Sequence, residues 1–303
     1  MKLYFDFSAI LGIATLITGM LWAIDSLFLK SKRLRKNQAV LDKLGLAATD
    51  VSTIPPEEID EKIKQQGEIH ETAAKMPKWA DYSRSFFPVL LLVFVLRAFI
   101  IEPFRIPSGS MRPTLQEGDF ILVNKFAYGL RLPLTGTKLL DWGKPQRGDI
   151  LVFRYPHDTS VDYIKRIIGL PGDKVKVVNK QLYVNGEPVS QEYIETNFET
   201  DDGGLRKVKR YHEQLDSTVY SIYSSLIQRP DFAEIEVPAN HFFVLGDNRE
   251  RSRDSREWGF VPEHLILGKA FFIWLSFDAQ KKDIRWERFG SIQSSQREQQ
   301  PHA

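Results

Sequence analysis

The chain has 303 residues, no cysteine and a nearly balanced charge, with 41 Lys and Arg against 39 Asp and Glu. The absence of cysteine excludes disulfides, thiolate catalysis and cysteine-ligated metal sites. The balanced charge argues against the one-sided basic surface of a nucleic-acid-binding protein. A chain of this length can form one large domain or two small ones.

The first apolar segment is FSAILGIATLITGMLWAI, from Phe7 to Ile24, and SLFL extends it beyond Asp25 to Leu29. This stretch is long enough to cross the hydrocarbon layer, so we predict a first transmembrane segment within residues 1–29. A cleaved signal peptide is the alternative, although the stretch lacks a basic n-region and a small-x-small cleavage site. The basic segment KSKRLRK follows at residues 30–36 and indicates that residues 30–84 form a cytoplasmic loop.

That loop is polar and charged, with helical spacing but too few apolar residues for a core of its own. The second apolar run, SFFPVLLLVFVLRAFII, predicts a second transmembrane segment over residues 85–101. Arg97 interrupts the run near its end, where a long side chain can reach the membrane interface. A helix lying in the interface is the alternative. Two spans place everything after Glu102 on the outer side of the membrane.

Short apolar runs bounded by Gly, Pro, Asn or Asp dominate the chain after residue 102, and they are typical of β-strands. They cover residues 118–126, 147–155, 162–170, 173–189, 240–247 and 267–277. The sequence VNGE at residues 184–187 is typical of a two-residue hairpin turn. No amphipathic pattern long enough for a major helix occurs between residues 105 and 275. We therefore predict a mainly β fold: an antiparallel β domain preceded by two N-terminal transmembrane helices.

Residues 190–235 are more polar and less regular than the runs around them, which indicates an inserted smaller β lobe or a mobile excursion. We predict a main β domain from residues 102–177 and 241–290, with residues 178–240 as the inserted second lobe. Residues 291–303 are predicted to be a flexible tail.

The segment PSGSMRPT at residues 107–114 contains the candidate nucleophile, because two serines flank a glycine soon after the second apolar run. A serine hydroxyl needs a base to accept its proton. None of the six histidines lies in an acyl-transfer or metal-binding motif, and GxSxG is absent. A Ser-His-Asp triad stays open, since triads are assembled in space. No metal or other cofactor is needed for either chemistry.

A lysine that burial keeps neutral is the other base available to a serine. Lys165 in DYIKRIIGL fits, because alternation places it between Tyr163 and Ile167 on one strand face. Lys125 and Lys269 also lie in strand-like apolar runs and compete for the role. Any of the three can instead be an ordinary edge-strand charge.

Four motifs in this order, PSGSMRPT, RGDILVF, YIKRIIGLPGD and GDNRERSRDSREWGFVP, follow two apolar segments. With this arrangement the chain resembles bacterial signal peptidase I (leader peptidase), a membrane-bound serine endopeptidase with a Ser/Lys dyad. The resemblance covers essentially the whole chain, most clearly residues 85–177 and 240–275.

The resemblance implies roles for individual residues. Ser110 matches the nucleophile and Lys165 the general base. Ser108 matches the residue whose hydroxyl forms the oxyanion hole together with the Ser110 backbone N–H. Ser252 matches the serine that orients the lysine, and Asp254 and Arg256 match charged residues that support the site. A plain ion pair that holds a loop remains the alternative for Asp254 and Arg256.

The implied substrates are the signal peptides of exported precursors, which end in small residues at alternate positions. An extended substrate can add to a sheet edge and place alternate side chains in shallow apolar pockets. Candidate pocket residues, each of which can instead be plain core, are Phe104, Ile106, Ile121, Leu122, Val152 and Tyr163.

We expect the protein in the bacterial inner membrane with its β domain on the periplasmic side. Membrane lipid and the translocation machinery are further expected partners, whereas nucleic acid is not. A Ser/Lys protease of the self-cleaving repressor or organelle type is one rival, although no helix-turn-helix occurs. A membrane-anchored, non-enzymatic β module that binds envelope partners is the other.

Overall fold

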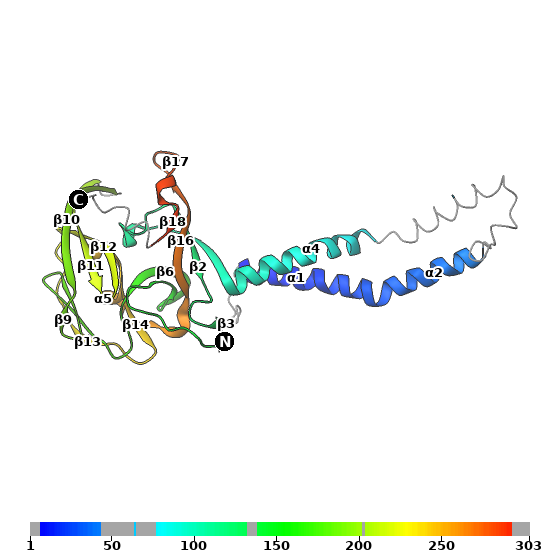
Figure 1. Cartoon of the computed structure of the whole chain (residues 1–303), viewed down its shortest axis with the longest axis horizontal. Coiled ribbons are helices and arrows are strands. Elements are labelled where there is room, and N and C mark those ends of the chain that lie inside the picture. Colours follow the sequence, from blue (N-terminus) through cyan, green and yellow to red (C-terminus); the bar gives the residue numbers. More distant parts are fainter. Residues whose placement is uncertain (1–6, 44–63, 65–76, 132–137, 202–203, 293–303) are drawn as a thin grey trace. The chain divides into compact units, whose positions relative to one another are not determined.

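The computed structural model of the chain describes residues 7–43, 64, 77–131, 138–201 and 204–292. The chain divides into two compact units, a smaller one over residues 3–97 and a larger one that begins at Ala98. Figure 1 shows helices in the first unit and mainly strands in the second. The predicted fold class, an antiparallel β domain preceded by two apolar helices, is confirmed.

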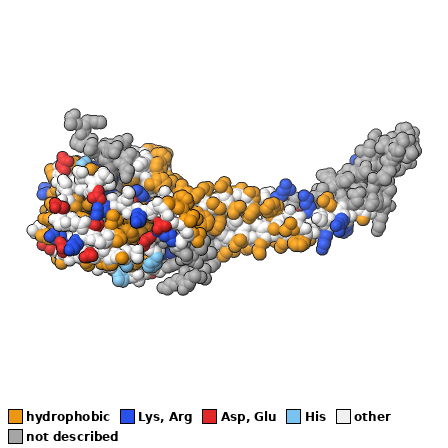
Figure 2. Space-filling view, turned by 60° about the horizontal axis from the view of Figure 1, so that its bottom comes forward, with side chains coloured by type: hydrophobic (Ala, Val, Ile, Leu, Met, Phe, Trp, Pro, Cys, Tyr) orange, Lys and Arg blue, Asp and Glu red, His pale blue; other side chains and the backbone are white. Residues whose placement is uncertain are grey.

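The smaller unit is built from two long helices. The first comprises α1 (Phe7–Ile24), a π-helical turn (Asp25–Leu29) and α2 (Lys30–Lys43); the second comprises α4 (Lys78–Val95) and a π-helical turn (Leu96–Ile100). The helix around the second apolar run therefore begins at Lys78, seven residues before the predicted start of the span. Both helices are long and apolar enough to cross a membrane. Their exposed sides are mostly hydrophobic in Figure 2, and Lys and Arg side chains gather along α2.

The two helices pack through glycines on α1 that receive aromatic rings from α4. A Cβ at Gly12 would lie 2.9 Å from the Phe94 ring, and one at Gly19 would lie 2.7 Å from the Phe87 ring. Trp22 stacks on Phe87 with ring centroids 5.5 Å apart. Small residues at such positions let apolar helices approach closely without a hydrophobic driving force between them.

The larger unit contains one principal antiparallel sheet with the strand order β1-β2-β16-β5-β6-β14-β15, and β17 and β18 also pair with β16. These strands are β1 (Ile101–Arg105), β2 (Asp119–Asn124), β5 (Ile150–Tyr155), β6 (Asp158–Gly169), β14 (His241–Leu245), β15 (Val261–Pro262), β16 (Ile266–Asp278), β17 (Asp283–Ile284) and β18 (Gly290–Ser291). Every expected run between residues 118 and 277 contains a strand. The runs are rich in β-branched and aromatic residues, which favour strands.

Smaller sheets complete the described part of this unit. One has the order β13-β7-β8-β9 and one the order β3-β4. Their strands are β3 (Leu130–Arg131), β4 (Lys138–Leu140), β7 (Lys174–Val178), β8 (Gln181–Val184), β9 (Glu187–Pro188) and β13 (Phe232–Glu236). The predicted hairpin turn joins β8 to β9, with positive φ at Asn185 and Gly186. Within the described residues of this unit, the α-helix is the single turn α5 (Ser255–Trp258).

Of the two alternatives for residues 190–235, the smaller β lobe is confirmed and the mobile excursion is not. These residues form a regular antiparallel sheet of β10 (Ser190–Asp201), β11 (Gly204–Leu215) and β12 (Thr218–Ser225). The strands are polar because one face meets solvent, while Tyr220 and Ile222 on the other face are buried. These two side chains share a hydrophobic cluster with Ile168 and Phe243 of the principal sheet.

One cluster of buried side chains contains residues from both sides of the predicted domain bounds at 177/178 and 240/241. The division into two domains at these positions therefore stays a prediction. At the other end, Ser291 belongs to β18 and Ile292 is buried. Residues 293–303 of the predicted tail lie outside the described residues, as do residues 44–63 and 65–76 of the predicted cytoplasmic loop.

Candidate active site

Ser110 occupies a short turn between β1 and β2, the 3-10 helix Gly109–Met111. Asn248, which follows β14, holds this turn by its carbonyl groups: its backbone N–H donates to Ser110 O at 3.1 Å and its side-chain amide donates to Gly109 O at 2.9 Å. Met111 is fully buried in the cluster under the turn. The carbonyls and the following side chain thus fix the turn, and the Ser110 hydroxyl remains available for chemistry.

Lys165 on β6 reaches this hydroxyl directly. Its Nζ lies 2.7 Å from Ser110 Oγ and 2.9 Å from the carbonyl oxygen of Ile164. The two residues are 55 positions apart in sequence, so the contact depends on the tertiary fold. Tyr163 lies on the same strand face, with its ring centroid 5.4 Å from Nζ, as the alternation of side chains predicts.

The surroundings of Lys165 favour the neutral amine. The residue is 4% exposed, and among the described residues no carboxylate lies within 4 Å of its Nζ. Burial lowers the pKa of Lys165 to about 8, although Asp254 and Asp247 act at longer range to raise it. About a tenth of the lysine is therefore deprotonated at pH 7, and this fraction can accept a proton from Ser110.

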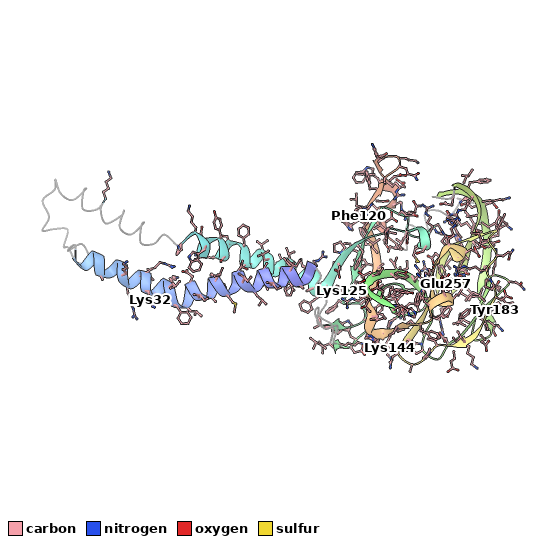
Figure 3. All side chains as sticks on the ribbon, turned by 180° about the vertical axis from the view of Figure 1, so that it is seen from behind. Lys32, Phe120, Lys125, Lys144, Tyr183 and Glu257 are labelled. Carbon is pink, nitrogen blue, oxygen red and sulfur yellow. The ribbon has the colours of Figure 1, made fainter. Side chains whose placement is uncertain are left out.

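The two competing lysines have a different environment. Lys125 lies 3.1 Å from Glu102, and Lys269 lies 2.5 Å from Asp149. Both are therefore cations paired with carboxylates, which is the ordinary state of a strand lysine. Lys125 is marked in Figure 3 near the end of β2.

Other buried charges near the site are compensated pair by pair. Arg166 makes a bidentate contact with Asp247, at 2.8 Å from Nε to Oδ1 and 2.7 Å from Nη2 to Oδ2. Arg256 contacts Asp254 in the same way, at 2.8 Å and 2.7 Å. Arg249 pairs with the fully buried Glu213 of β11. These pairs leave no neighbouring carboxylate free to keep Lys165 protonated.

Asp254 and Arg256 hold the loop that follows β14. Asp254 caps α5 and accepts a hydrogen bond from the Gly246 backbone N–H at 3.1 Å, while Arg256 donates to the Arg249 carbonyl at 2.5 Å. Neither side chain makes a recorded contact with Ser110 or Lys165. The structure thus places this pair beside the dyad, in a role that acts through the loop.

Ser252 is fully buried in this loop, and its hydroxyl makes no hydrogen bond within the described structure. A Cβ at Gly246 would lie 2.1 Å from Ser252 Oγ and 2.5 Å from Ser110 O. Glycine at position 246 therefore allows Ser252 to approach the nucleophile turn. The predicted contact between Ser252 and the lysine is not among the hydrogen bonds of this conformation.

Ser108 precedes the turn directly and is exposed, with an extended backbone at φ −137° and ψ 154°. Its hydroxyl and the Ser110 backbone N–H thus belong to one short stretch of chain. The predicted oxyanion hole requires these two hydrogen-bond donors to lie close together.

The predicted pocket residues do not all come together. Ile106, Ile121 and Val152 are buried in one cluster, with Phe104 packed against it. Leu122 follows Ile121 on β2 and therefore faces the other side of the sheet. Tyr163 packs in a separate cluster with Phe153 and Trp258. Three of the six are thus core side chains, while Phe104, Leu122 and Tyr163 are partly exposed, and the Tyr163 ring lies next to Lys165.

Sequence reasoning missed several residues that build the site. Asn248 holds the nucleophile turn, and Asp247 with Arg166 compensates the charge beside Lys165. Both Asp247 and Asn248 lie in the motif GDNRERSRDSREWGFVP. The residue types were visible there, but their partners are 81 and 139 positions away. Within the described residues, no group of three His, Asp or Glu side chains is arranged to hold a metal ion.

Comparisons with known proteins identify the family of the chain. A model of the family described as "Signal peptidase, peptidase S26" matches residues 79–275. The chain is 40% identical over 290 residues to signal peptidase I of Pseudomonas fluorescens, covering 91% of this chain and 94% of the relative. It is 47% identical over 227 residues to signal peptidase I of Pseudomonas aeruginosa, covering 70% of this chain and 78% of the relative.

A relative from Haemophilus influenzae, also a signal peptidase I, is 34% identical and covers 93% of this chain and 90% of its own length. A crystal structure of a signal peptidase I from Enterococcus faecalis V583 aligns with 30% sequence identity and a TM-score of 0.27. It covers 42% of this chain and 96% of that structure.

Proposed function

The chain belongs to the signal peptidase family, peptidase S26, and we propose that its nucleophile is Ser110 and its general base is Lys165. It is a membrane-anchored serine endopeptidase that acts on precursor proteins bearing signal peptides. The observation that carries the residue assignment is the 2.7 Å contact between Lys165 Nζ and Ser110 Oγ. The burial that keeps this lysine partly neutral supports it.

In the proposed reaction, the neutral Lys165 amine accepts the Ser110 proton as Ser110 Oγ attacks the scissile carbonyl. The tetrahedral oxyanion accepts hydrogen bonds from the Ser110 N–H and the Ser108 hydroxyl, each worth on the order of 3 kcal/mol. The C–N bond then breaks, and the lysine ammonium returns the proton to the leaving amine. Lys165 next deprotonates a water that hydrolyses the acyl-enzyme and restores Ser110.

Ser252, Asp254 and Arg256 are proposed to support the dyad. The buried Ser252 hydroxyl, which lacks a partner in this conformation, is available to the lysine when it carries the transferred proton. The Asp254–Arg256 pair keeps the loop that bears Ser252 in place through Gly246 and Arg249. A negative Asp254 also favours the ammonium form of Lys165 at longer range.

The signal peptide is proposed to bind as an extended strand next to the nucleophile turn, with small side chains near the scissile bond. In the described sheet β1 is an edge strand, and Phe104 lies on it. Edge strands accept extended peptides by main-chain pairing. Ile106, Ile121 and Val152, which are buried in one cluster, are proposed to form the floor of the substrate pocket. Leu122 and Tyr163 lie outside that cluster, so their predicted role in the pocket stays a prediction.

We propose that the two helices anchor the protein in the inner membrane, with the β unit on the periplasmic side. The basic stretch of α2 supports a cytoplasmic position for residues 30–84. Contact between lipid and the β unit is supported by exposed aromatic residues on and beside β16. Phe120, labelled in Figure 3, packs edge-on against one of them, Trp274. The exposed ones are Phe271, Trp274, Phe277, Trp286 and Phe289, and Phe120 is partly exposed. Precursors would reach the enzyme from the translocation machinery, the remaining proposed partner.

Family membership argues against the alternative of a non-enzymatic β module. The test is cleavage of a purified exported precursor by the full-length protein in detergent, with the Ser110→Ala variant alongside. The expected result is one cut after the signal peptide by the wild type and none by the variant. An uncut precursor, or cleavage that survives in Ser110→Ala, would refute the assignment.

A further inference from the structure

The side chain of Arg112 connects the nucleophile turn to the distant strand β10. Arg112 lies two residues after Ser110, and its Nη1 is 2.7 Å from Glu199 Oε2, 87 positions away in sequence. Its Nε donates to Glu117 Oε2 at 2.7 Å. A Cβ at Gly109 would lie 2.6 Å from Glu117 Oε1 and 3.1 Å from Arg112 Nε. The Arg112 guanidinium and the Glu117 carboxylate therefore pack directly against the glycine that precedes Ser110.

Tyr223 of β12 connects the same two regions by a second route. Its hydroxyl donates to Glu199 Oε1 at 3.0 Å. Its backbone N–H donates to Asp247 O at 2.9 Å, and it forms a bridge with Asn248. Asn248 in turn donates to the carbonyls of Gly109 and Ser110. The contacts therefore close a ring from the nucleophile turn through Asn248, Tyr223, Glu199 and Arg112 back to the turn.

The ring is partly removed from solvent, which strengthens its charged contacts. The Arg112 side chain is 18% exposed and that of Glu199 is 24% exposed. Tyr223 is buried, and burial together with Glu199 raises its pKa to about 12, so the hydroxyl stays a donor at physiological pH. Hydrogen bonds with an ionised partner are stronger than neutral ones and narrower in geometry.

We propose that Arg112, Glu199 and Tyr223 are positioning residues through which the sheet β10–β12 fixes the turn that carries Ser110. The inference rests on the proposed function, because it assigns these residues to the reaction of that dyad. Ser110 Oγ must stay within hydrogen-bonding distance of Lys165 and in line with the scissile carbonyl. A misplacement of about 1 Å can lower the rate by up to about 10²-fold. The ring holds both ends of the turn against such a displacement.

The test compares kcat and KM of full-length variants in detergent, with a peptide substrate that spans a signal-peptide cleavage site. Glu199→Gln should lower kcat about tenfold with KM within about twofold of the wild type, since Glu199 is proposed to act through Arg112 and Tyr223 on the turn and not on the substrate. Tyr223→Phe removes one hydroxyl and should lower kcat about threefold. Arg112→Lys should recover part of the loss seen in Arg112→Met, because it restores the charge but not the two-carboxylate geometry.

The double variant Arg112→Met/Glu199→Gln should have a kcat within about twofold of Arg112→Met alone, because one interaction is lost only once. Glu195→Gln is the matched control. Glu195 lies on β10, as Glu199 does, and its ion pair at 3.4 Å is with Arg210 of β11 and not with the nucleophile turn. Its kcat should equal that of the wild type. Thermal unfolding of each variant checks that the fold persists.

Wild-type kcat in Glu199→Gln, losses that multiply in the double variant, or an equal loss in Glu195→Gln would each overturn the proposal. The wild type and Ser110→Ala in the same assay separate the two levels of the account. A wild type that fails to cleave refutes the proposed function and the positioning role together. A wild type that cleaves beside an unimpaired Glu199→Gln refutes the positioning role alone.

Discussion

The two faces of β6 carry two consecutive basic residues, Lys165 and Arg166, which are equally buried but differ in how firmly they hold a proton. Lys165 is 4% exposed and Arg166 is 2% exposed. Arg166 meets the Asp247 carboxylate, the Gly148 carbonyl at 2.7 Å and the Tyr220 ring at 4.0 Å. Lys165 meets a serine hydroxyl and one carbonyl. Burial alone therefore does not decide the charge of a side chain; the presence of a carboxylate partner does.

The difference matches the chemistry of the two groups. A guanidinium does not give up its proton in a protein, so a buried arginine needs a counter-ion. An amine can lose its proton instead, which avoids the cost of burying a charge. One strand thus carries a permanent cation that organises the core on one face and a proton acceptor on the other.

Lys165→Arg breaks this comparison most completely, because it places a permanent cation on the face that has no carboxylate. Precursor cleavage should fall at least about 10³-fold, as when a member of a catalytic unit is removed. Lys165→Ala should fall similarly, which shows that size is not the cause. Initial rates with a purified precursor measure both. A Lys165→Arg enzyme with more than a tenth of wild-type activity is incompatible with a lysine base.

Asp247→Asn removes the ion pair on the opposite face of β6, between Asp247 and Arg166. It leaves the buried Arg166 without its counter-ion, which should lower the free energy of unfolding by about 3–5 kcal/mol. Asp216→Asn is the control, since Asp216 is 58% exposed and pairs with Arg147, which keeps Asp173. That change should cost no more than about 1 kcal/mol. Unfolding by heat or urea measures both; equal losses would remove the distinction between the two kinds of pair.

Lys165→Met tests how much the burial of Lys165 costs in folding free energy. A lysine pKa lowered from 10.5 to about 8 in the folded state means that the unfolded state binds protons more tightly. The wild type therefore loses stability as the pH falls from 10.5 through 8, by about 3 kcal/mol in total. Methionine has no such cost, so Lys165→Met should be more stable than the wild type at pH 7.

The gain in Lys165→Met should shrink as the pH rises above 8. Thermal unfolding of both proteins between pH 6 and pH 10.5 measures it. Parallel stability curves over this range would show that Lys165 has the same pKa in both states.

Gly246→Ala tests the link between β14 and the nucleophile turn. Gly246 directly follows Leu245, the β14 residue that pairs with Arg166. The added methyl would collide with the Ser252 hydroxyl and the Ser110 carbonyl. We expect about 1–3 kcal/mol of destabilisation and a kcat about tenfold lower. Gly172→Ala is the control, since no atom lies within 4 Å of its Cβ position although its φ is +88°. Unchanged kcat in Gly246→Ala would mean that the loop yields without cost.

The strands of the principal sheet were predictable because they are short runs of β-forming apolar residues bounded by turn residues, as in DYIKRIIGLPGD. The choice of Lys165 over Lys125 and Lys269 was not settled by pattern. It depends on Glu102 and Asp149, which reach the other two lysines only after the strands pair. The motif resemblance supplied that choice at the sequence level.

The sheet β10–β12 was the part for which the sequence left two alternatives open, a smaller β lobe and a mobile excursion. Its residues are polar because one face is exposed and because Glu199, Arg210 and Glu213 make ion pairs within the fold. A local reading cannot distinguish a polar strand with distant partners from an irregular segment. The hydrogen bonds of Asn248 could not be predicted for the same reason, since their acceptors are distant backbone carbonyls that no sequence pattern indicates.

The central claim, that a neutral Lys165 is the base, is tested most directly by the pH dependence of kcat/KM for precursor cleavage by the wild-type enzyme. The pKa of about 8 predicts a rate that rises about tenfold per pH unit below pH 8 and levels off above it. The midpoint should fall in Asp247→Asn, which removes a charge that raises this pKa. A rate that stays constant from pH 5.5 to pH 9 would contradict the account.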